Sequence, residues 1–268
     1  MAGNTTPAGA TVISRVLALL GAFDEHHRRL TLTQLARRTG LSPATVYRHT
    51  GELVAGGVLA RNSHGEYMIG HKMWELGLLA PVQTDLRQVA SPFLQDLYAT
   101  TRATVHLAIR EDTEVLYVER LSGNASVPVL SWAGSKLPLH ATGVGKVLLA
   151  YAPPRIRERV LQQLPRFTPY TVTQPARLTA QLSAVRRHGY ATTVEEMTLG
   201  ACSVAVPVHT PGRDTGDIAA LGIVVPALPR DRARLTAALH VTAQGISRSL
   251  PPPTDHPGPQ DAPNWGDG

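Results

Sequence analysis

The residues that follow Ser42 have the types and spacing of a helix that could read DNA. Ser42 and Pro43 together favour a helix start, because the serine hydroxyl can accept a hydrogen bond from a free N–H and proline has no N–H to leave unpaired. If Val46 and Thr50 point into a small core, five residues lie mainly on the outer face near the helix start: Ala44, Thr45, Tyr47, Arg48 and His49. Such side chains can reach base edges in a DNA major groove.

The polar side chains on this face suit different parts of DNA. Arg48 could donate two hydrogen bonds to a guanine, Thr45 could contact a base or a thymine methyl group, and Tyr47 could reach a phosphate or sugar. Ser42 and the neighbouring amides could hold a phosphate at the helix N-terminus. Three more residues would add positive charge: Arg37, Arg38 and Arg61. The alternative is that these side chains simply face solvent, which explains Tyr47 and His49 at least as well.

The surrounding segments predict a winged helix-turn-helix domain over residues 11–70. Apolar residues at spacings of three and four, with a cap at Thr31 and a stop at Gly40, favour three helices followed by a hairpin. The predicted elements are helices over 11–23, 31–40 and 42–55 and strands over 58–61 and 66–69. A short helix over 71–80 would link this domain to the rest of the chain.

A larger domain is predicted over residues 81–250. Its predicted elements are helices over 86–100, 143–150, 155–163, 178–188 and 230–250 and strands over 103–109, 114–121, 203–207 and 218–225. Helices beside antiparallel-type strands favour the α+β class over a doubly wound sheet. The tails, 1–10 and 251–268, are rich in Pro, Gly, Asp and Asn, so we expect them to be flexible or disordered.

Composition narrows the class of protein without naming the partner. The 268 residues are 43% hydrophobic and 17% charged, and no run of eighteen apolar residues predicts a membrane span. The net charge of +6 favours a polyanionic partner, although the basic excess is not concentrated in one patch. The single cysteine, Cys202, excludes an internal disulfide, and no secretory signal is evident at the start, so we expect a cytoplasmic protein. We expect no cofactor and no metal site.

Several motifs make this sequence similar to the IclR family of transcription regulators. In the first half these are RVLALL at 15–20, LTQLARRTGLSPATVYRHT at 32–50, GVLARNSHGEYMI at 57–69 and HKMWELG at 71–77. In the second half they are LPLHATGVGKVLLA at 137–150 and RHGYATTVEEMTLGACSVAVPV at 187–208. The resemblance covers residues 12–250.

This resemblance implies a C-terminal effector-binding domain of α/β, GAF-like fold, which takes a small organic acid or aromatic metabolite. It also implies a homodimer or homotetramer on palindromic double-stranded DNA operators, and we expect a repressor ahead of an activator. The family's pocket positions fall here on Leu130, His140, Thr142, Gly143, Val144, Thr193, Ser203, Gly222 and Val224.

The transferred pocket predicts an anionic ligand. Gly143 would let a ligand approach backbone amides at a helix start, where partial positive charge favours a carboxylate. Ser203 stands where the family usually has cysteine, and Gly222 and Val224 replace hydroxyl side chains, which indicates a larger and less polar effector. Effector binding would then change the relative placement of two DNA-binding heads in a dimer, through the linker helix.

Three other classes of protein remain as alternatives. An enzyme finds little support, because Gly145-Lys146 lacks the rest of a P-loop and Glu195-Glu196 resembles two solvated carboxylates. Cys202 could be a nucleophile with His140 or His209 as its base, but a lone cysteine in an apolar stretch is more typical of a buried hydrophobic residue. A redox-sensing regulator would use Cys202 as the switch. A pure interaction scaffold would leave the face with Thr45 and Arg48 unexplained.

Overall fold

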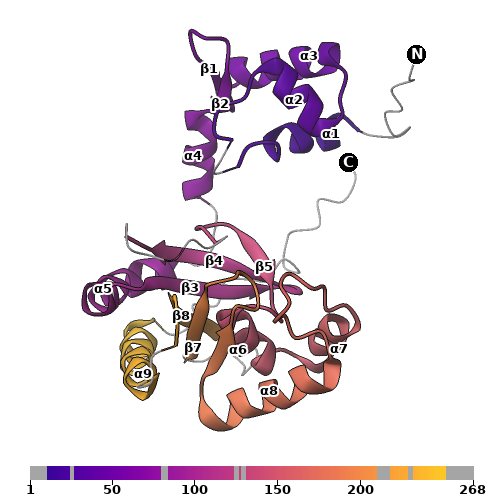
Figure 1. Ribbon diagram of the computed structural model, residues 1–268. Helices are drawn as coiled ribbons and strands as arrows, with labels where there is room; N and C mark the ends of the chain where they lie inside the picture. The colour runs from indigo at the N-terminus through magenta and orange to yellow at the C-terminus, as the bar shows by residue number, and fades with distance from the viewer. Residues whose placement is uncertain are drawn as a thin grey trace, which may run out of the picture. The chain divides into compact units, whose positions relative to one another are not determined.

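The computed structural model describes residues 11–24, 27–79, 84–123, 127, 131–209, 218–228 and 232–251. They form two compact units, one that ends with α4 (His71–Leu78) and one that begins with α5 (Thr84–Thr101) (Figure 1). The predicted N-terminal tail, Leu130 and nearly all of the predicted C-terminal tail lie outside the described residues.

The first unit contains three packed helices and a two-stranded hairpin. Its elements before α4 are α1 (Val12–Leu20), α2 (Leu32–Thr39), α3 (Pro43–Ala55), β1 (Leu59–Arg61) and β2 (Tyr67–Ile69). The strands pair antiparallel, with Leu59 opposite Ile69. Leu19, Leu35 and Val46 are fully buried, which brings one apolar face of each helix into a common core. The predicted winged helix-turn-helix is confirmed.

Local signals at the helix ends fix where α3 begins. The Thr31 hydroxyl accepts from the Gln34 N–H at 3.3 Å, while the Gln34 side chain accepts from the Thr31 N–H at 2.8 Å, so two free donors are satisfied at the start of α2. Gly40 ends α2 with a φ of 69°, a conformation that glycine adopts without strain. Ser42 then caps α3 by accepting from the Thr45 N–H at 3.3 Å.

The second unit is built on a six-stranded antiparallel sheet in the order β5-β4-β3-β8-β7-β6. The strands are β3 (Thr104–Glu111), β4 (Glu114–Leu121), β5 (Lys136–Pro138), β6 (Ala191–Val194), β7 (Cys202–His209) and β8 (Ile218–Val225). The sequence analysis predicts the four long strands but neither β5 nor β6, because strands of three and four residues carry too little alternation to be recognised.

Helices cover both faces of this sheet (Figure 1). On one face lie α5 and α9 (Arg232–Ser249), and on the other α6 (Gly143–Tyr151), α7 (Pro154–Gln162) and α8 (Pro175–His188). The mixture of helices with an antiparallel sheet confirms the predicted α+β class.

The two faces of the central strands differ in side-chain size. Alternate residues of a strand point to opposite faces, so each strand can carry large residues on one side and small ones on the other. The face toward α5 and α9 carries Val105, Leu107, Val204, Val206, Leu221 and Ile223. The face toward α6 carries Ala108, Ala205 and Ala220. Helix α6 therefore approaches the sheet closely, and its residues from 143 to 150 are all buried.

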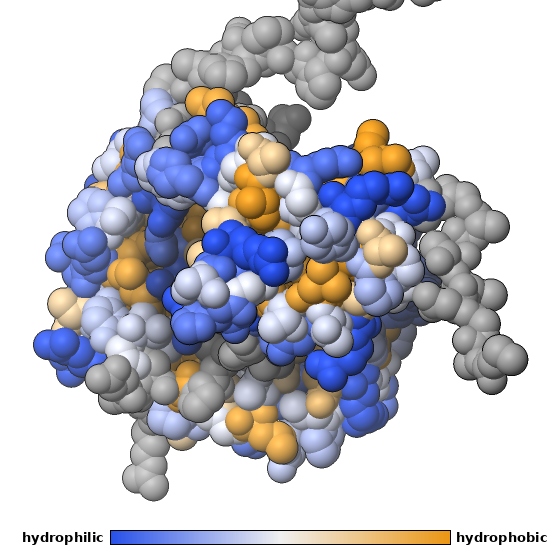
Figure 2. Space-filling view, turned by 90° about the horizontal axis from the view of Figure 1, so that it is seen from above, coloured by the Kyte–Doolittle hydropathy of each residue, from blue (hydrophilic) through white to orange (hydrophobic). Residues whose placement is uncertain are grey.

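The surface mixes hydrophilic and hydrophobic residues. On the face shown in Figure 2, hydrophobic residues form separate groups among hydrophilic ones. In the first unit, two helices carry large exposed apolar side chains. On α1 these are Val12, Ile13 and Leu17, and on α4 and directly after it they are Trp74, Leu76 and Leu79. Within the described residues, no helix is long and apolar enough to cross a membrane.

Two glycines of the first unit should respond in opposite ways to alanine. A Cβ at Gly70 would lie 2.2 Å from the Gly57 carbonyl oxygen, whereas a Cβ at Gly77, inside α4, would meet nothing within 4 Å. We expect Gly70→Ala to lower the free energy of unfolding by about 2 kcal/mol or more, and Gly77→Ala to raise it by about 0.5–1 kcal/mol. Urea unfolding of the full chain, followed by circular dichroism, measures both. Equal effects would contradict the packing described for Gly70.

Candidate functional site

The start of α3 presents an exposed polar face. The Tyr47 side chain is 66% exposed and Arg48 is also exposed. Thr45 is half-buried, and its hydroxyl lies 2.8 Å from that of Ser42, so both hydroxyls take part in the helix cap. Among the predicted contact residues of this helix, Tyr47 and Arg48 are therefore the most accessible to a partner.

The three other predicted arginines differ in their surroundings. Arg37 is exposed. Arg38 donates from Nη2 to Asp24 at 2.6 Å, which partly neutralises its charge. Arg61 lies in the wing, 5.3 Å from the centre of the Tyr67 ring, a distance typical of a cation–π contact. Arg37 and Arg61 keep their charge at the surface of the first unit.

His49 corrects the sequence analysis. We expected its side chain on the outer face of α3, yet it is only 2% exposed. His49 follows Val46 by three residues, and residues at this spacing share one face of a helix, which here is the core face. Both ring nitrogens are buried without a hydrogen-bond partner. His49 therefore lies in the core of the first unit and not on the outer face of α3.

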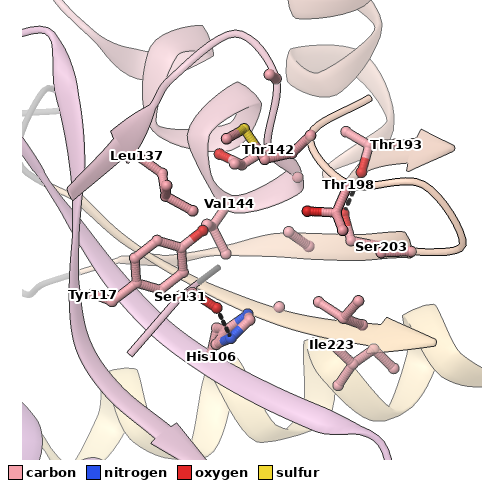
Figure 3. Close-up of a pocket in the computed structure, with 17 residues that line it drawn as sticks. His106, Tyr117, Ser131, Leu137, Thr142, Val144, Thr193, Thr198, Ser203 and Ile223 are labelled. Carbon is pink, nitrogen blue, oxygen red and sulfur yellow. Dashed lines mark hydrogen bonds between the residues drawn. The ribbon is translucent and has the colours of Figure 1, made fainter. Parts of the chain in front are cut away.

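The second unit contains a cavity between the sheet and the N-terminus of α6 (Figure 3). Seven of the nine predicted pocket residues line it: Thr142, Gly143, Val144, Thr193, Ser203, Gly222 and Val224. His140 does not, because its ring turns toward the 165–167 segment, where Nε2 lies 3.0 Å from the Pro165 carbonyl oxygen. His140 therefore lies outside this cavity, its role in effector binding stays a prediction, and Leu130 lies outside the described residues.

Other lining residues escaped the sequence analysis. They come from β3, β4, β5 and the loops beside the sheet, and include His106, Tyr117, Ser131, Leu137, Met197 and Thr198. The strands carrying His106 and Tyr117 were predicted, but the sequence does not show which of their faces meets α6. One feature of the sequence indicates this face. Val105 and Leu107, on either side of His106, are large apolar residues that share one face of β3, so His106 points to the other face.

Two glycines that line the cavity also allow α6 to lie close to the sheet. A Cβ at Gly143 would lie 2.4 Å from the Ser203 hydroxyl oxygen, and one at Gly222 would lie 2.8 Å from Cγ1 of Val144. Both distances are too short for real atoms. These glycines are therefore required for the close approach of α6 to β7 and β8.

Hydrogen bonds hold the polar side chains of the cavity in place. Thr193 and Ser203 share a hydrogen bond of 2.6 Å, and the Ser131 hydroxyl lies 2.8 Å from Nε2 of His106, as Figure 3 shows. The Thr142 hydroxyl accepts from the Gly145 N–H at 3.1 Å and caps α6.

The cavity is electrically neutral at its walls. Burial, helped by the charge of Arg120, lowers the pKa of His106 to about 3, so its imidazole is uncharged at neutral pH. Burial also raises the pKa of Tyr117 above its usual value, and its phenol keeps its proton. The other described residues that line the cavity are apolar or carry only hydroxyl groups. Among the described residues, positive potential comes from the N-terminus of α6 and, near His106, from Arg120.

A buried ion pair lies beside the cavity. Nζ of Lys146, on α6, is 2.5 Å from Oε1 of Glu196, and the two side chains are 1% and 7% exposed. From the sequence we expect Glu196 to be solvated, and this prediction is wrong because the side chain is buried. Its backbone carbonyl also accepts from the Thr171 hydroxyl at 2.6 Å. Because Met197 and Thr198 follow directly and line the cavity, Glu196 anchors that wall to α6.

Cys202 is buried, 5% exposed, with its Sγ 3.9 Å from the Pro226 carbonyl oxygen. Within the part of the chain that the structure describes, no three His, Cys, Asp or Glu side chains cluster in a way that could hold a metal ion.

A winged helix domain and a second domain with a cavity, joined in one chain, are typical of transcription regulators that bind DNA and respond to a small molecule. Family comparison agrees. The family of the bacterial transcriptional regulator IclR C-terminal domain matches residues 80–248, and the IclR helix-turn-helix domain matches residues 12–63. The chain belongs to the IclR family and is a transcription regulator of the IclR type.

Individual relatives are similar over most of their length. The HTH-type transcriptional regulator XynR of Escherichia coli is 32% identical over 89% of this chain and 96% of its own. The p-hydroxybenzoate hydroxylase transcriptional activator of Acinetobacter baylyi is 34% identical over 73% and 74%. The crystal structure of an IclR homologue from Microbacterium hydrocarbonoxydans, complexed with 4-hydroxybenzoate, has a TM-score of 0.82 and 35% identity, covering 90% of this chain and 99% of that one.

Removing one member of the buried ion pair should lower the free energy of unfolding. Lys146→Met leaves the Glu196 carboxylate buried without its partner, and we expect a loss of about 3 kcal/mol in the free energy of unfolding. The double variant Lys146→Met/Glu196→Gln removes both charges and should be less destabilised than the single variant. Urea unfolding measures both. As a control, Arg159→Met breaks the exposed pair with Asp112 and should cost less than about 1 kcal/mol. An equally small cost for Lys146→Met would contradict the anchoring role.

His106 should make the protein less stable in mild acid. Its folded pKa of about 3 lies below the ordinary value of 6.5, so the unfolded chain binds the proton first as the pH falls. Stability is then lost as the pH falls below about 6.5, by roughly 2 kcal/mol between about pH 7.5 and pH 5. His106→Phe should lack this loss. The measurement is urea unfolding of both proteins at the two pH values, and parallel losses would show that His106 is not the cause.

Proposed function

We propose that this chain binds operator DNA with α3 and that an organic acid or aromatic metabolite in the cavity controls this binding. One observation carries the proposal: a single chain combines an exposed Tyr47 and Arg48 at the start of α3 with a neutral-walled cavity at the start of α6. We assign residues 11–70 to DNA binding, 71–80 to the link and 81–250 to effector binding.

In the DNA complex, Arg48 and Thr45 contact bases, while Tyr47 and Ser42 contact the sugar-phosphate backbone. Arg37, Arg38 and Arg61 supply positive charge to phosphates. The exposure of Arg48 and the position of Ser42 at the N-terminus of α3 support this division. Base contacts then set sequence preference, and phosphate contacts set affinity.

In the effector complex, the ligand carboxylate lies at the N-terminus of α6. The first hydrogen bond inside this helix is donated by Lys146 to the Thr142 carbonyl, so the N–H groups of Gly143 and Val144 precede it and suit an anion. Ser203 and Thr193 add hydroxyl groups beside them. The complex of one relative with 4-hydroxybenzoate supports an aromatic acid as ligand.

Several further properties belong to the same proposal. We expect a homodimer or homotetramer on a palindromic operator, and the exposed apolar side chains of α1 and α4, such as Ile13 and Trp74, suit contacts between chains.

We expect repression, although one relative is by its name an activator. Since its relatives are bacterial regulators of DNA, we place this chain in the cytoplasm. We assign it no catalytic activity and no redox role for Cys202.

Arg48→Ala tests the proposal. Fluorescence anisotropy with DNA from the region upstream of the protein's own gene, across a salt series, compares wild type with the variant. We expect salt-sensitive, selective binding by wild type, and a loss of about 1–3 kcal/mol with reduced selectivity in Arg48→Ala.

Arg155→Ala, which changes an exposed arginine of α7, is the matched control and should bind as wild type does. Failure of wild type to prefer any fragment of genomic DNA over random duplex, with or without added aromatic acids, would overturn the proposed function.

A further inference from the structure

Arg120 is a basic residue on the cavity side of the sheet. It lies on β4, directly opposite His106 on β3. Residues that face each other across two antiparallel strands point to the same side of the sheet, with Cβ atoms about 5 Å apart. The preceding residue agrees with this side, because Glu119 pairs with Arg87 of α5, the helix that covers the other face. The Arg120 side chain therefore lies next to His106, on the side of the sheet that forms the cavity wall.

Arg120 has a buried hydrogen-bond donor without an acceptor. Its Nε is buried and has no hydrogen-bond partner among the described residues. Glu119, the adjacent acidic residue, is held by Nε of Arg87 at 2.7 Å. The connection from β4 to β5, residues 122–135, contains no Asp or Glu in its sequence. Because a buried donor without an acceptor is unfavourable, Arg120 is suited to an anion that comes from outside the chain.

The charge of Arg120 acts on the wall of the cavity. Burial, and after it the charge of Arg120, lowers the pKa of the His106 imidazole. His106 lines the cavity and shares a hydrogen bond of 2.8 Å with the Ser131 hydroxyl, which lines it as well. An anion beside His106 would therefore meet two neutral hydrogen-bonding groups together with a positive charge.

The cavity thus has an anion-favouring group at each end. At one end, the free N–H groups of Gly143 and Val144 start α6 beside Ser203 of β7. The other end is at His106 of β3, and Figure 3 shows it away from the Ser203 side. Strand β8 lies between β7 and β3, so two strand spacings, about 10 Å, separate the ends. The wall also includes apolar side chains: Leu137, Val144 and Ala205. An elongated molecule with an anionic group at each end matches this arrangement.

We propose that the cavity binds a dicarboxylate, with one carboxylate at the start of α6 and the second held by Arg120. A guanidinium group can donate two parallel hydrogen bonds to a carboxylate, which makes arginine the suitable residue for this end. His106 and Ser131 add neutral hydrogen-bonding groups beside it. The inference rests on the proposed function, since it takes an organic acid in the cavity as the effector, and it adds a second charge to that ligand and a residue that binds it.

Isothermal titration of the full chain tests the inference by comparing two dicarboxylates, each with its own monomethyl ester. The flat benzene-1,4-dicarboxylate and the flexible hexanedioate each lose one charge in the ester but keep nearly the same length. We expect at least one dicarboxylate to bind about tenfold more tightly than its ester, because its second carboxylate forms charge-assisted hydrogen bonds with Arg120.

Three variants assign this difference to Arg120. Arg120→Gln removes the charge, so the dicarboxylate should lose its advantage while the Kd of the ester changes little. Arg120→Lys keeps the charge and should keep part of the advantage. Arg87→Gln removes a positive charge beside β4 on the opposite face of the sheet, and it should keep the wild-type ratio of the two Kd values. A wild-type ratio in Arg120→Gln, even with both ligands weakened, would show that Arg120 supports the fold and does not bind the second carboxylate.

The outcomes separate this inference from the proposed function. Esters that bind as tightly as both dicarboxylates overturn the second anion site and leave the effector function intact. Failure of all four ligands to bind overturns both the second site and the assignment of an organic acid to the cavity. A dicarboxylate advantage that is lost in Arg120→Gln and kept in Arg87→Gln supports both.

Discussion

The close approach of α6 to the antiparallel sheet is the constraint on which the second unit depends. It requires very small residues at the contact, because Cβ atoms at Gly143 and Gly222 would lie within 3 Å of the Ser203 and Val144 side chains across it. It also buries every residue of α6 from 143 to 150, including the lysine. A helix that is buried on all sides must have each of its polar groups satisfied inside the protein.

The buried lysine explains much of the surrounding architecture. Lys146 needs an anionic partner, and Glu196 supplies it from the segment between β6 and β7. That segment turns sharply, with positive φ angles at Glu195 and Gly200, and the hydroxyl groups of Thr168 and Thr171 hold its carbonyls. One ion pair thus connects α6 to the wall of the cavity. It also balances the lysine charge, so Lys146 adds little positive potential to the cavity beside the N-terminus of α6.

The parts of the fold that could be predicted from the sequence are those with local physical causes. The capping residues Thr31 and Ser42 and the glycine stop at Gly40 act within one turn of helix, so their effect is visible in the sequence. The positions of His49 and His106 depend instead on which face of an element meets the core, and the spacing of neighbouring apolar residues is the only local indication of that face. Glu196 could not be paired with Lys146 by pattern, because fifty residues separate them and only the folded sheet brings them together.

The same constraint limits where ligand preference can change. Gly143 and Gly222 contact the Ser203 and Val144 side chains across the interface of α6 with the sheet, so larger residues there would displace the helix rather than reshape the cavity. His106, on β3, lines the cavity, contacts Ser131 and Tyr117, and is outside the glycine contacts of α6. It can be exchanged for a residue of other polarity without changing those glycine contacts. The cavity wall at the start of α6 is therefore constrained by the fold, while the wall at His106 lies outside these glycine contacts and is where side chains can vary.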